Sequence, residues 1–320
     1  MINGIKQLHA ISFLLPFAAL LTTACTTSVM DEPDTDARAI IFRTPQAETR
    51  ATVEGSSLTS GNLLVWGWYA DADGTNTTNV FDAVQVTGTD GSWTYTDTKY
   101  WILGKKYAFY AVYPASLPTK TAVTVNQDGT FTLTDFDCSA TGPDAVDLMT
   151  ATATRTYDGT DNSSVGLSFG HELAWVTCGV TSEVSAVTVK QLRLYGVAHQ
   201  GTLTRTISPA WSSVTSCTAD DTPFKTDTEF TLNSTDGRRK DNVLGDLLLL
   251  PQQPDAAVFA LTYRYNGDTT DRIATVSLPA DTQWKAGERY KYTLMLKAAD
   301  VILNVTVTSW EEENTSVSWG

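Results

Sequence analysis

Residues 121–134 read TAVTVNQDGTFTLT. Apolar and polar side chains alternate on both sides of the segment 126–129, whose polar residues and glycine are typical of a hairpin turn. The same period of two recurs in VILNVTVT at 301–308 and in the aromatic run YAFYAVY at 107–113. No window of eleven or more residues has the i, i+3, i+4, i+7 stripe of an amphipathic helix. The sequence therefore predicts an all-β protein built from sandwiches.

The charge and composition of the 320-residue chain exclude two broad classes. With 36 Asp and Glu against 22 Lys and Arg, the net charge is −14, so no basic face is expected for nucleic acid. A hydrophobic content of 42% is too high for a disordered protein. The length predicts two domains, and the turn-rich stretch 156–164 divides them into 39–160 and 161–320.

The first residues are typical of an export signal. The apolar stretch 11–24 follows Lys6 and is too short to span a bilayer of about 30 Å as a helix, so residues 1–24 are expected to be a signal peptide. The stretch ends in LTTAC, which resembles a bacterial lipobox, although its Leu stands four places before Cys25 rather than three. We expect a lipid on Cys25 and an acidic tether over 25–38, with ordinary secretion as the alternative.

Motifs of catalysis and of metal binding are missing from the sequence. It contains no Gly-x-Ser-x-Gly, His-Glu-x-x-His, Walker A or Gly-x-Gly-x-x-Gly pattern, and three histidines exclude a His-rich metal site. Cys138, Cys178 and Cys217 are too widely spaced to predict a disulfide framework or a metal site. Their state stays open, although Cys178 alternates with valines and is expected in the core. The sequence predicts no enzyme, no metal and no cofactor.

Aromatic residues cluster in the first third of the chain. Trp66 and Trp68 are two apart, which places them on one face of a strand, and Tyr100 and Trp101 follow. If exposed, these four side chains would form a platform for sugar rings. If buried, they would fill a core, because each Trp removes about 150–250 Å² from water. The platform leads to an alternative function, a monomeric surface glycan-binding lipoprotein.

Arg50 is the most informative single residue. It lies in the polar segment 47–52, shortly after the apolar run 39–42. An arginine in an extended, exposed linker is a good substrate for an Arg-specific protease, because extended segments enter protease clefts. Arg43 is the main rival cleavage site, and Arg38 and the basic loop 238–240 are others.

The ordered set of motifs along the chain resembles the fimbrillin family of Bacteroidetes, the subunits and accessory proteins of protease-assembled pili. The segments that carry this resemblance are TRA at 49–51, NLLVWGWY at 62–69, WTY at 93–95, KYW at 99–101, YAFYAVYP at 107–114, DLM at 147–149, VGLSFGHELA at 165–174, LLLPQ at 248–252, GERYKYTL at 287–294 and VTVTSW at 305–310.

The resemblance implies two tandem transthyretin-like β-sandwiches and a structural role in a pilus for cell adhesion. It also implies export as a lipoprotein to the outer membrane, cleavage after an arginine, and polymerisation with other fimbrillin subunits by strand exchange. On this chain it places the lipid on Cys25 and the cut at Arg50. The first strand, about 39–43 with Ile40, Ile41 and Phe42, would then be released.

The end of the chain bears on the position in such a pilus. The tail 311–320 is short, its first half is acidic, and only Val317 and Trp319 could dock. A stalk subunit needs a longer alternating donor strand, so the tail favours a tip or accessory subunit. An uncut anchor stays open, and the sequence does not predict the host or glycan ligand.

Overall fold

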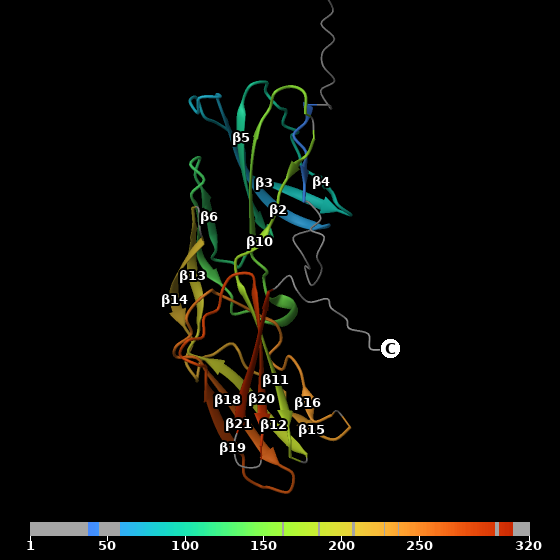
Figure 1. Ribbon diagram of the computed structural model, residues 1–320, viewed down its shortest axis with the longest axis vertical. Helices are drawn as coiled ribbons and strands as arrows, with labels where there is room; N and C mark the ends of the chain where they lie inside the picture. The colour runs from blue at the N-terminus through green and yellow to red at the C-terminus, as the bar shows by residue number, and fades with distance from the viewer. Residues whose placement is uncertain are drawn as a thin grey trace, which may run out of the picture.

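The computed structural model describes residues 38–44, 58–161, 163–184, 186–206, 209–226, 228–235, 237–297 and 301–309. Their regular structure is β-strand apart from one short 3-10 helix, η2 (Gly142–Asp144), so the all-β prediction is confirmed. These residues form an elongated body with the early strands at one end and the late strands at the other (Figure 1). No helix among them is long and apolar enough to cross a membrane.

A six-stranded antiparallel sheet forms the N-terminal end. In spatial order its strands are β10 (Gly170–His171), β8 (Met149–Thr156), β5 (Lys106–Tyr113), β2 (Gly61–Ala70), β3 (Thr78–Thr89) and β4 (Ser92–Thr94). Successive side chains of a strand point to opposite faces. In β2, Leu63 and Val65 therefore enter the first core, whereas Leu64 and Trp66 face a second, larger core.

The first core is closed by two short strands. β1 (Phe42–Arg43) and β9 (Val165–Gly166) pair in parallel, and Phe42 and Val165 are buried with the inner side chains of the six-stranded sheet. The N-terminal segment is thus a structural part of the first sandwich.

A four-stranded sheet lies between the two ends of the molecule. Its order is β14 (Pro209–Ser216), β13 (Ala198–Arg205), β7 (Phe131–Asp137) and β6 (Ala122–Val125). β6 and β7 form the predicted hairpin, in which Asn126 donates its N–H to the Thr130 carbonyl over 2.9 Å. β7 then pairs with β13, so hydrogen bonds join the early and late parts of the chain.

Two further sheets face each other at the C-terminal end. One contains β16 (Arg239–Lys240), β11 (Ala174–Ser182), β20 (Glu288–Leu296) and β21 (Val301–Ser309), with β17 (Leu247–Leu249) also paired to β11. The other contains β15 (Phe230–Leu232), β12 (Val187–Tyr195), β18 (Val258–Tyr265) and β19 (Arg272–Ser277). Cys178 of β11 is fully buried between them, as its alternation with valine predicts.

The boundary expected between 160 and 161 does not separate these sheets. β9 and β10 follow the boundary in sequence but belong to the N-terminal end, where Val165 of β9 is buried in the first core and β10 pairs with β8. The hairpin of β6 and β7 precedes the boundary, and its strand β7 pairs with β13. The polar stretch 156–164 is a turn-rich connection, as its composition indicates. Composition can predict a local turn, but it does not predict which distant strand a segment will pair with. The division into 39–160 and 161–320 is corrected accordingly.

Candidate functional site

Residues 38–44 are hydrogen-bonded on both sides. On one side Ile40 donates its N–H to the Lys99 carbonyl (2.8 Å), and Trp101 donates to the Arg38 carbonyl (2.9 Å). On the other side the N–H groups of residues 165 and 167 donate to the carbonyls of residues 41 and 43, over 2.7 and 2.8 Å. The segment runs antiparallel to 99–101 and parallel to β9. It therefore fills a slot between two neighbouring pieces of backbone.

Side chains of this segment alternate between core and solvent. Ile40 and Phe42 are 1% and 2% exposed, whereas Ile41 between them is 47% exposed. The Phe42 ring packs edge to face on Phe81 and Phe109, with centroids 5.3 and 5.5 Å apart. Burying one isoleucine and one phenylalanine stabilises this arrangement by about 3–6 kcal/mol. Of the three predicted strand residues, only two point inward.

Hydrogen-bonding side chains from β4 and the residue after it hold the segment in place. Tyr95 donates its hydroxyl to the Ile40 carbonyl over 2.7 Å, and burial raises the pKa of this tyrosine. Trp93 Nε1 donates to Thr44 Oγ1 over 3.2 Å, and the Thr44 hydroxyl donates to the Leu58 carbonyl. Trp93 and Tyr95 were not predicted as anchors. Their spacing of two is typical of one face of a strand, but nothing in the sequence indicates which segment that face will meet.

Removal of residues 38–44 would leave a slot with an apolar floor and polar edges. Phe81, Phe109 and Tyr95 would lose their contact with Phe42. The N–H groups of residues 101, 165 and 167 would lose their acceptors. Unpaired backbone donors beside exposed apolar side chains are unfavourable, and they are the features that a new strand can satisfy.

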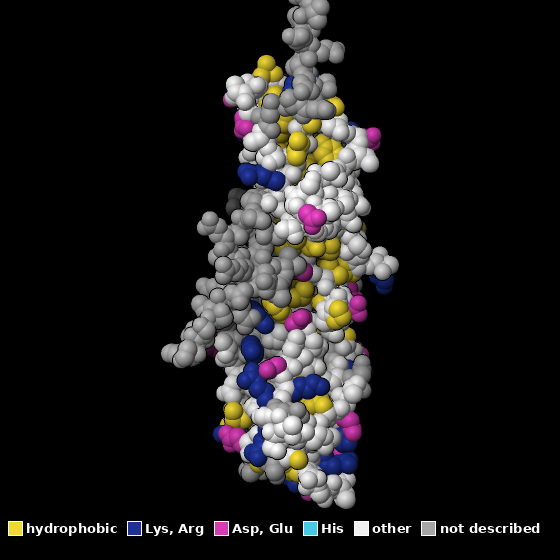
Figure 2. Space-filling model, turned by 90° about the vertical axis from the view of Figure 1, so that its right-hand side faces the viewer, with side chains coloured by type: hydrophobic (Ala, Val, Ile, Leu, Met, Phe, Trp, Pro, Cys, Tyr) yellow, Lys and Arg dark blue, Asp and Glu magenta, His cyan; other side chains and the backbone are white. Residues whose placement is uncertain are grey.

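Exposed apolar side chains surround the slot. Besides Ile41, the loop beside the segment exposes Tyr100, Ile102 and Leu103. Figure 2 shows hydrophobic side chains on the half of this face that belongs to the N-terminal end, whereas Lys and Arg side chains gather on the other half. A partner that met the slot would therefore also meet the apolar side chains of this loop.

The predicted cleavage residues divide between the described and undescribed parts of the chain. Arg50, Cys25 and the tail 311–320 lie outside the described residues. Arg43 is exposed at the end of β1. In the rival basic loop, Arg239 is paired with Asp241 (2.6 Å).

The proposed sugar platform is corrected by the structure. Trp66 and Trp101 are 5% and 2% exposed and lie in different cores, so neither offers a ring face to a ligand. Trp68 is partly buried against Tyr110, with ring centroids 6.0 Å apart. Only Tyr100 of the four is exposed. The tryptophans are buried because the six-stranded sheet is covered on both faces.

Side chains that could take part in catalysis or metal binding are scattered through the described part of the chain. His171 Nδ1 lies 2.9 Å from an Asp147 carboxylate oxygen. Cys138, Cys178 and Cys217 are free and buried, and burial raises the pKa of the Cys138 thiol to about 12. No group of three or more His, Cys, Asp or Glu in the described ranges could hold a metal ion. Asp71 forms an ion pair with Lys105.

A family model described as fimbrillin-like matches residues 49–310. The chain belongs to the fimbrillin-like family. No curated protein matches the sequence. Family membership points to a structural protein and not to an enzyme.

Solved structures share the fold of this fimbrillin-like chain at low sequence identity. A fimbrial protein from Bacteroides vulgatus is 18% identical with a TM-score of 0.60, and the match covers 85% of this chain and 99% of the other. A candidate cell adhesion protein from Bacteroides ovatus is 16% identical with a TM-score of 0.53, covering 86% and 98%. Another from Bacteroides uniformis is 20% identical with a TM-score of 0.50, covering 85% and 99%. At these identities the likeness establishes the fold alone.

Proposed function

We propose that this protein is a subunit of a surface pilus, exported as a lipoprotein through Cys25, cut after Arg50 by an Arg-specific protease and polymerised by β-strand exchange. Membership of the fimbrillin-like family supports the coarser statement, a fimbrial subunit that assembles with other subunits at the cell surface. The finer steps rest on the slot that holds residues 38–44. Until the cut, the lipid on Cys25 would anchor the subunit in the outer membrane.

The observation that carries the proposal is the place of Arg50 in the chain. The segment 38–44 is built into the first core, and Leu58 is the next described residue after it. Arg50 stands in the sequence that joins the two. A cut after Arg50 would leave the segment attached to the sandwich only by non-covalent contacts. It would then be free to leave together with the lipidated end.

A strand from a neighbouring subunit would restore the hydrogen bonds and the buried side chains that are lost when residues 38–44 leave. It would accept hydrogen bonds from the N–H groups of 101, 165 and 167 and would bury side chains at the positions of Ile40 and Phe42. Two such side chains supply about 3–6 kcal/mol before ordering costs. Each net hydrogen bond adds about 0.5–1.5 kcal/mol. A donor longer than residues 38–44 would bind more tightly, and a head-to-tail contact of this kind propagates into a filament.

The test compares purified wild type with Arg50→Ala after treatment with an Arg-specific protease. Wild type is expected to give a mass that begins at Ala51 and an SDS-resistant ladder. Arg50→Ala is expected to stay monomeric, because its first strand remains covalently attached. Arg43→Ala is the matched control and should behave as wild type.

Two results would contradict the proposal. One is a ladder from Arg50→Ala equal to that of wild type. The other is a subunit taken from pili that still carries its lipidated N-terminus, which would indicate an anchor instead of a cleaved tip or stalk subunit.

A further inference from the structure

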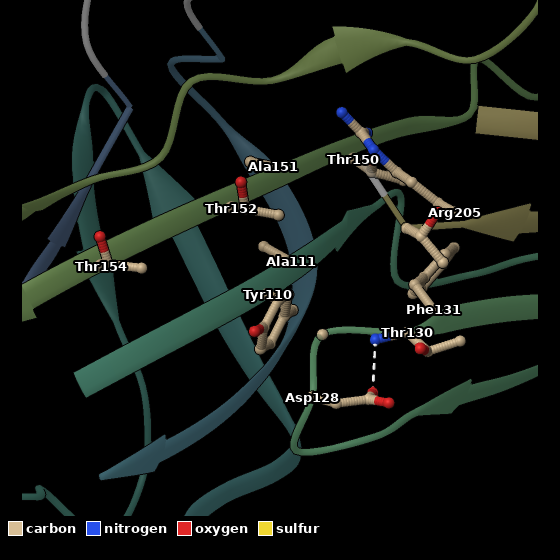
Figure 3. Close-up of a pocket in the computed structure, with 12 residues that line it drawn as sticks. Tyr110, Ala111, Asp128, Thr130, Phe131, Thr150, Ala151, Thr152, Thr154 and Arg205 are labelled. Atoms are coloured by element: carbon tan, nitrogen blue, oxygen red, sulfur yellow. Dashed lines mark hydrogen bonds between the residues drawn. The ribbon is translucent and has the colours of Figure 1, made fainter. Parts of the chain in front are cut away.

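A cavity of about 290 Å³ opens on the face of the six-stranded sheet opposite the slot. Figure 3 shows its walls: Tyr110 of β5, Thr152 and Thr154 along β8, Asp128 in the turn between β6 and β7, and Arg205 at the end of β13. None of these residues contributes to the site around residues 38–44. The walls come from two sheets and enclose a space about the size of a small ligand.

Arg205 is fixed at one end of the cavity by a buried acid. The Glu172 carboxylate, 2% exposed, accepts hydrogen bonds from Arg205 Nη1 and from the Thr150 hydroxyl. A buried ion pair is costly to desolvate, so it is a poor source of stability by itself. Its effect here is to hold the guanidinium in one orientation. The remaining donors of Arg205 have no partner among the described residues and stay available beside the cavity.

The other walls supply hydroxyl groups, a carboxylate and an aromatic ring. Thr152 and Thr154 are exposed, two residues apart on one face of β8, and their hydroxyls make no hydrogen bond within the described chain. Asp128 Oδ1 accepts the Thr130 N–H over 2.8 Å, and the Asp128 side chain is exposed at the cavity. Tyr110 packs closely on the turn, because a Cβ at Gly129 would lie 2.6 Å from the tyrosine oxygen. The turn and the ring therefore form a single wall.

The charges at the cavity favour a neutral ligand over an anionic one. The charged side chains that line the cavity are Arg205 and Asp128, and Arg205 also pairs with Glu172, so the cavity has no net positive charge. The whole chain has a net charge of −14, which also repels anions. An aspartate and an arginine at opposite ends make strong charge-assisted hydrogen bonds to neutral hydroxyls. The Tyr110 ring, which lies beside the turn that carries Asp128, can pack on an apolar ring face.

We propose that this cavity binds one neutral sugar residue at the end of a glycan. The Asp128 carboxylate accepts hydrogen bonds from ring hydroxyls, Arg205 donates to others, and Tyr110 packs against the sugar face. Thr152 and Thr154 bind hydroxyls along the open side. This inference goes beyond the proposed pilus function and is independent of cleavage and polymerisation.

The test uses the full-length, uncut protein on an array of neutral and sialylated glycans, followed by titration with free galactose, mannose, fucose and N-acetylglucosamine. Binding to at least one neutral glycan is expected. Asp128→Asn should weaken it by about tenfold or more, since a hydrogen bond to a charged group is worth about 1.5–3 kcal/mol. Thr154→Trp should abolish it by filling the cavity.

Thr156→Trp is the matched control, because Thr156 is the next exposed residue on the same face of β8 but does not line the cavity. It should bind as wild type does, and thermal unfolding should show that both tryptophan variants are folded. The proposal is overturned if no neutral glycan binds at millimolar concentration, if only sialylated glycans bind, or if Thr154→Trp binds as well as Thr156→Trp.

Discussion

The rings of Phe42 and Phe109 meet edge to face, with centroids 5.5 Å apart and planes at 86°. Phe42 belongs to a segment of seven described residues at the start of the chain, and Phe109 lies in the middle of the six-stranded sheet. This contact links the element proposed to be removed to the core that would be left open. The stability of the uncut protein and its capacity to assemble therefore depend on the same pair of side chains.

Phe42→Ala should destabilise the uncut protein by about 3–5 kcal/mol, because it leaves a cavity against Phe81 and Phe109. Urea unfolding of the intact chain measures the effect. Ile41→Ala is the matched control: its side chain is exposed, so it should change the free energy of unfolding by no more than about 0.5 kcal/mol. Equal effects of the two substitutions would show that the segment is not part of the core.

Gly88→Ala should weaken the attachment of residues 38–44 by displacing Trp93. A Cβ at residue 88 would lie 2.6 Å from the Trp93 ring, so the ring must move, and with it the donor that binds Thr44. We expect a loss of about 1–3 kcal/mol. We also expect faster hydrogen exchange at the Ile40 amide. Thr89→Ala, one residue away and exposed, is the control; the same exchange rate in both variants would contradict the link through Trp93.

The Glu172 carboxylate should give the protein a distinctive pH dependence. Burial raises the pKa of Glu172 above its ordinary value of 4.5, against the opposing effects of Arg205 and Thr150. The folded state then binds the proton more tightly than the unfolded state. The resulting stability is present below pH 4.5 and is lost as the pH rises through the folded-state pKa.

Unfolding of wild type and Glu172→Gln across pH 3–8 tests the direction of this pH dependence. The difference in free energy, wild type minus variant, should fall as the pH rises. A difference that rises with pH would show that the Arg205 pairing outweighs burial.

The buried thiols should be inert in the folded protein. Burial raises the pKa of Cys138 to about 12 and raises that of Cys178 as well. In a Cys25→Ser variant at pH 8, a thiol reagent should label almost no cysteine before unfolding, because thiolate is the reactive form. In denaturant, Cys138, Cys178 and Cys217 should all react. Rapid labelling of the folded chain would contradict the burial of these side chains.

Local features of the fold were predictable from the sequence, whereas long-range pairings were not. Alternation identified the hairpin at 121–134 and the buried position of Cys178, because side-chain direction in a strand follows from the period of two. The same reasoning could not tell that β7 would pair with β13, since many strands share the same pattern. Partner choice depends on how whole faces pack.

The candidate site shows the same limit. The family resemblance implied a first strand at about 39–43, but its burial between 99–101 and β9 depends on contacts with residues far along the chain. The sequence left two interpretations of Trp66, a place in a core and a place in a sugar platform. Trp66 is buried because the sheet β14-β13-β7-β6 covers the outer face of β2. The residues next to Trp66 in the sequence do not predict that this sheet lies there.

The slot has unlike walls, since residues 38–44 run antiparallel to 99–101 and parallel to β9. Strand exchange would join this slot on one subunit to a donor segment of the next, so each joint of the proposed fibre is head-to-tail. Subunits joined in this way would all point in the same direction, and the fibre would be polar, with two chemically different ends.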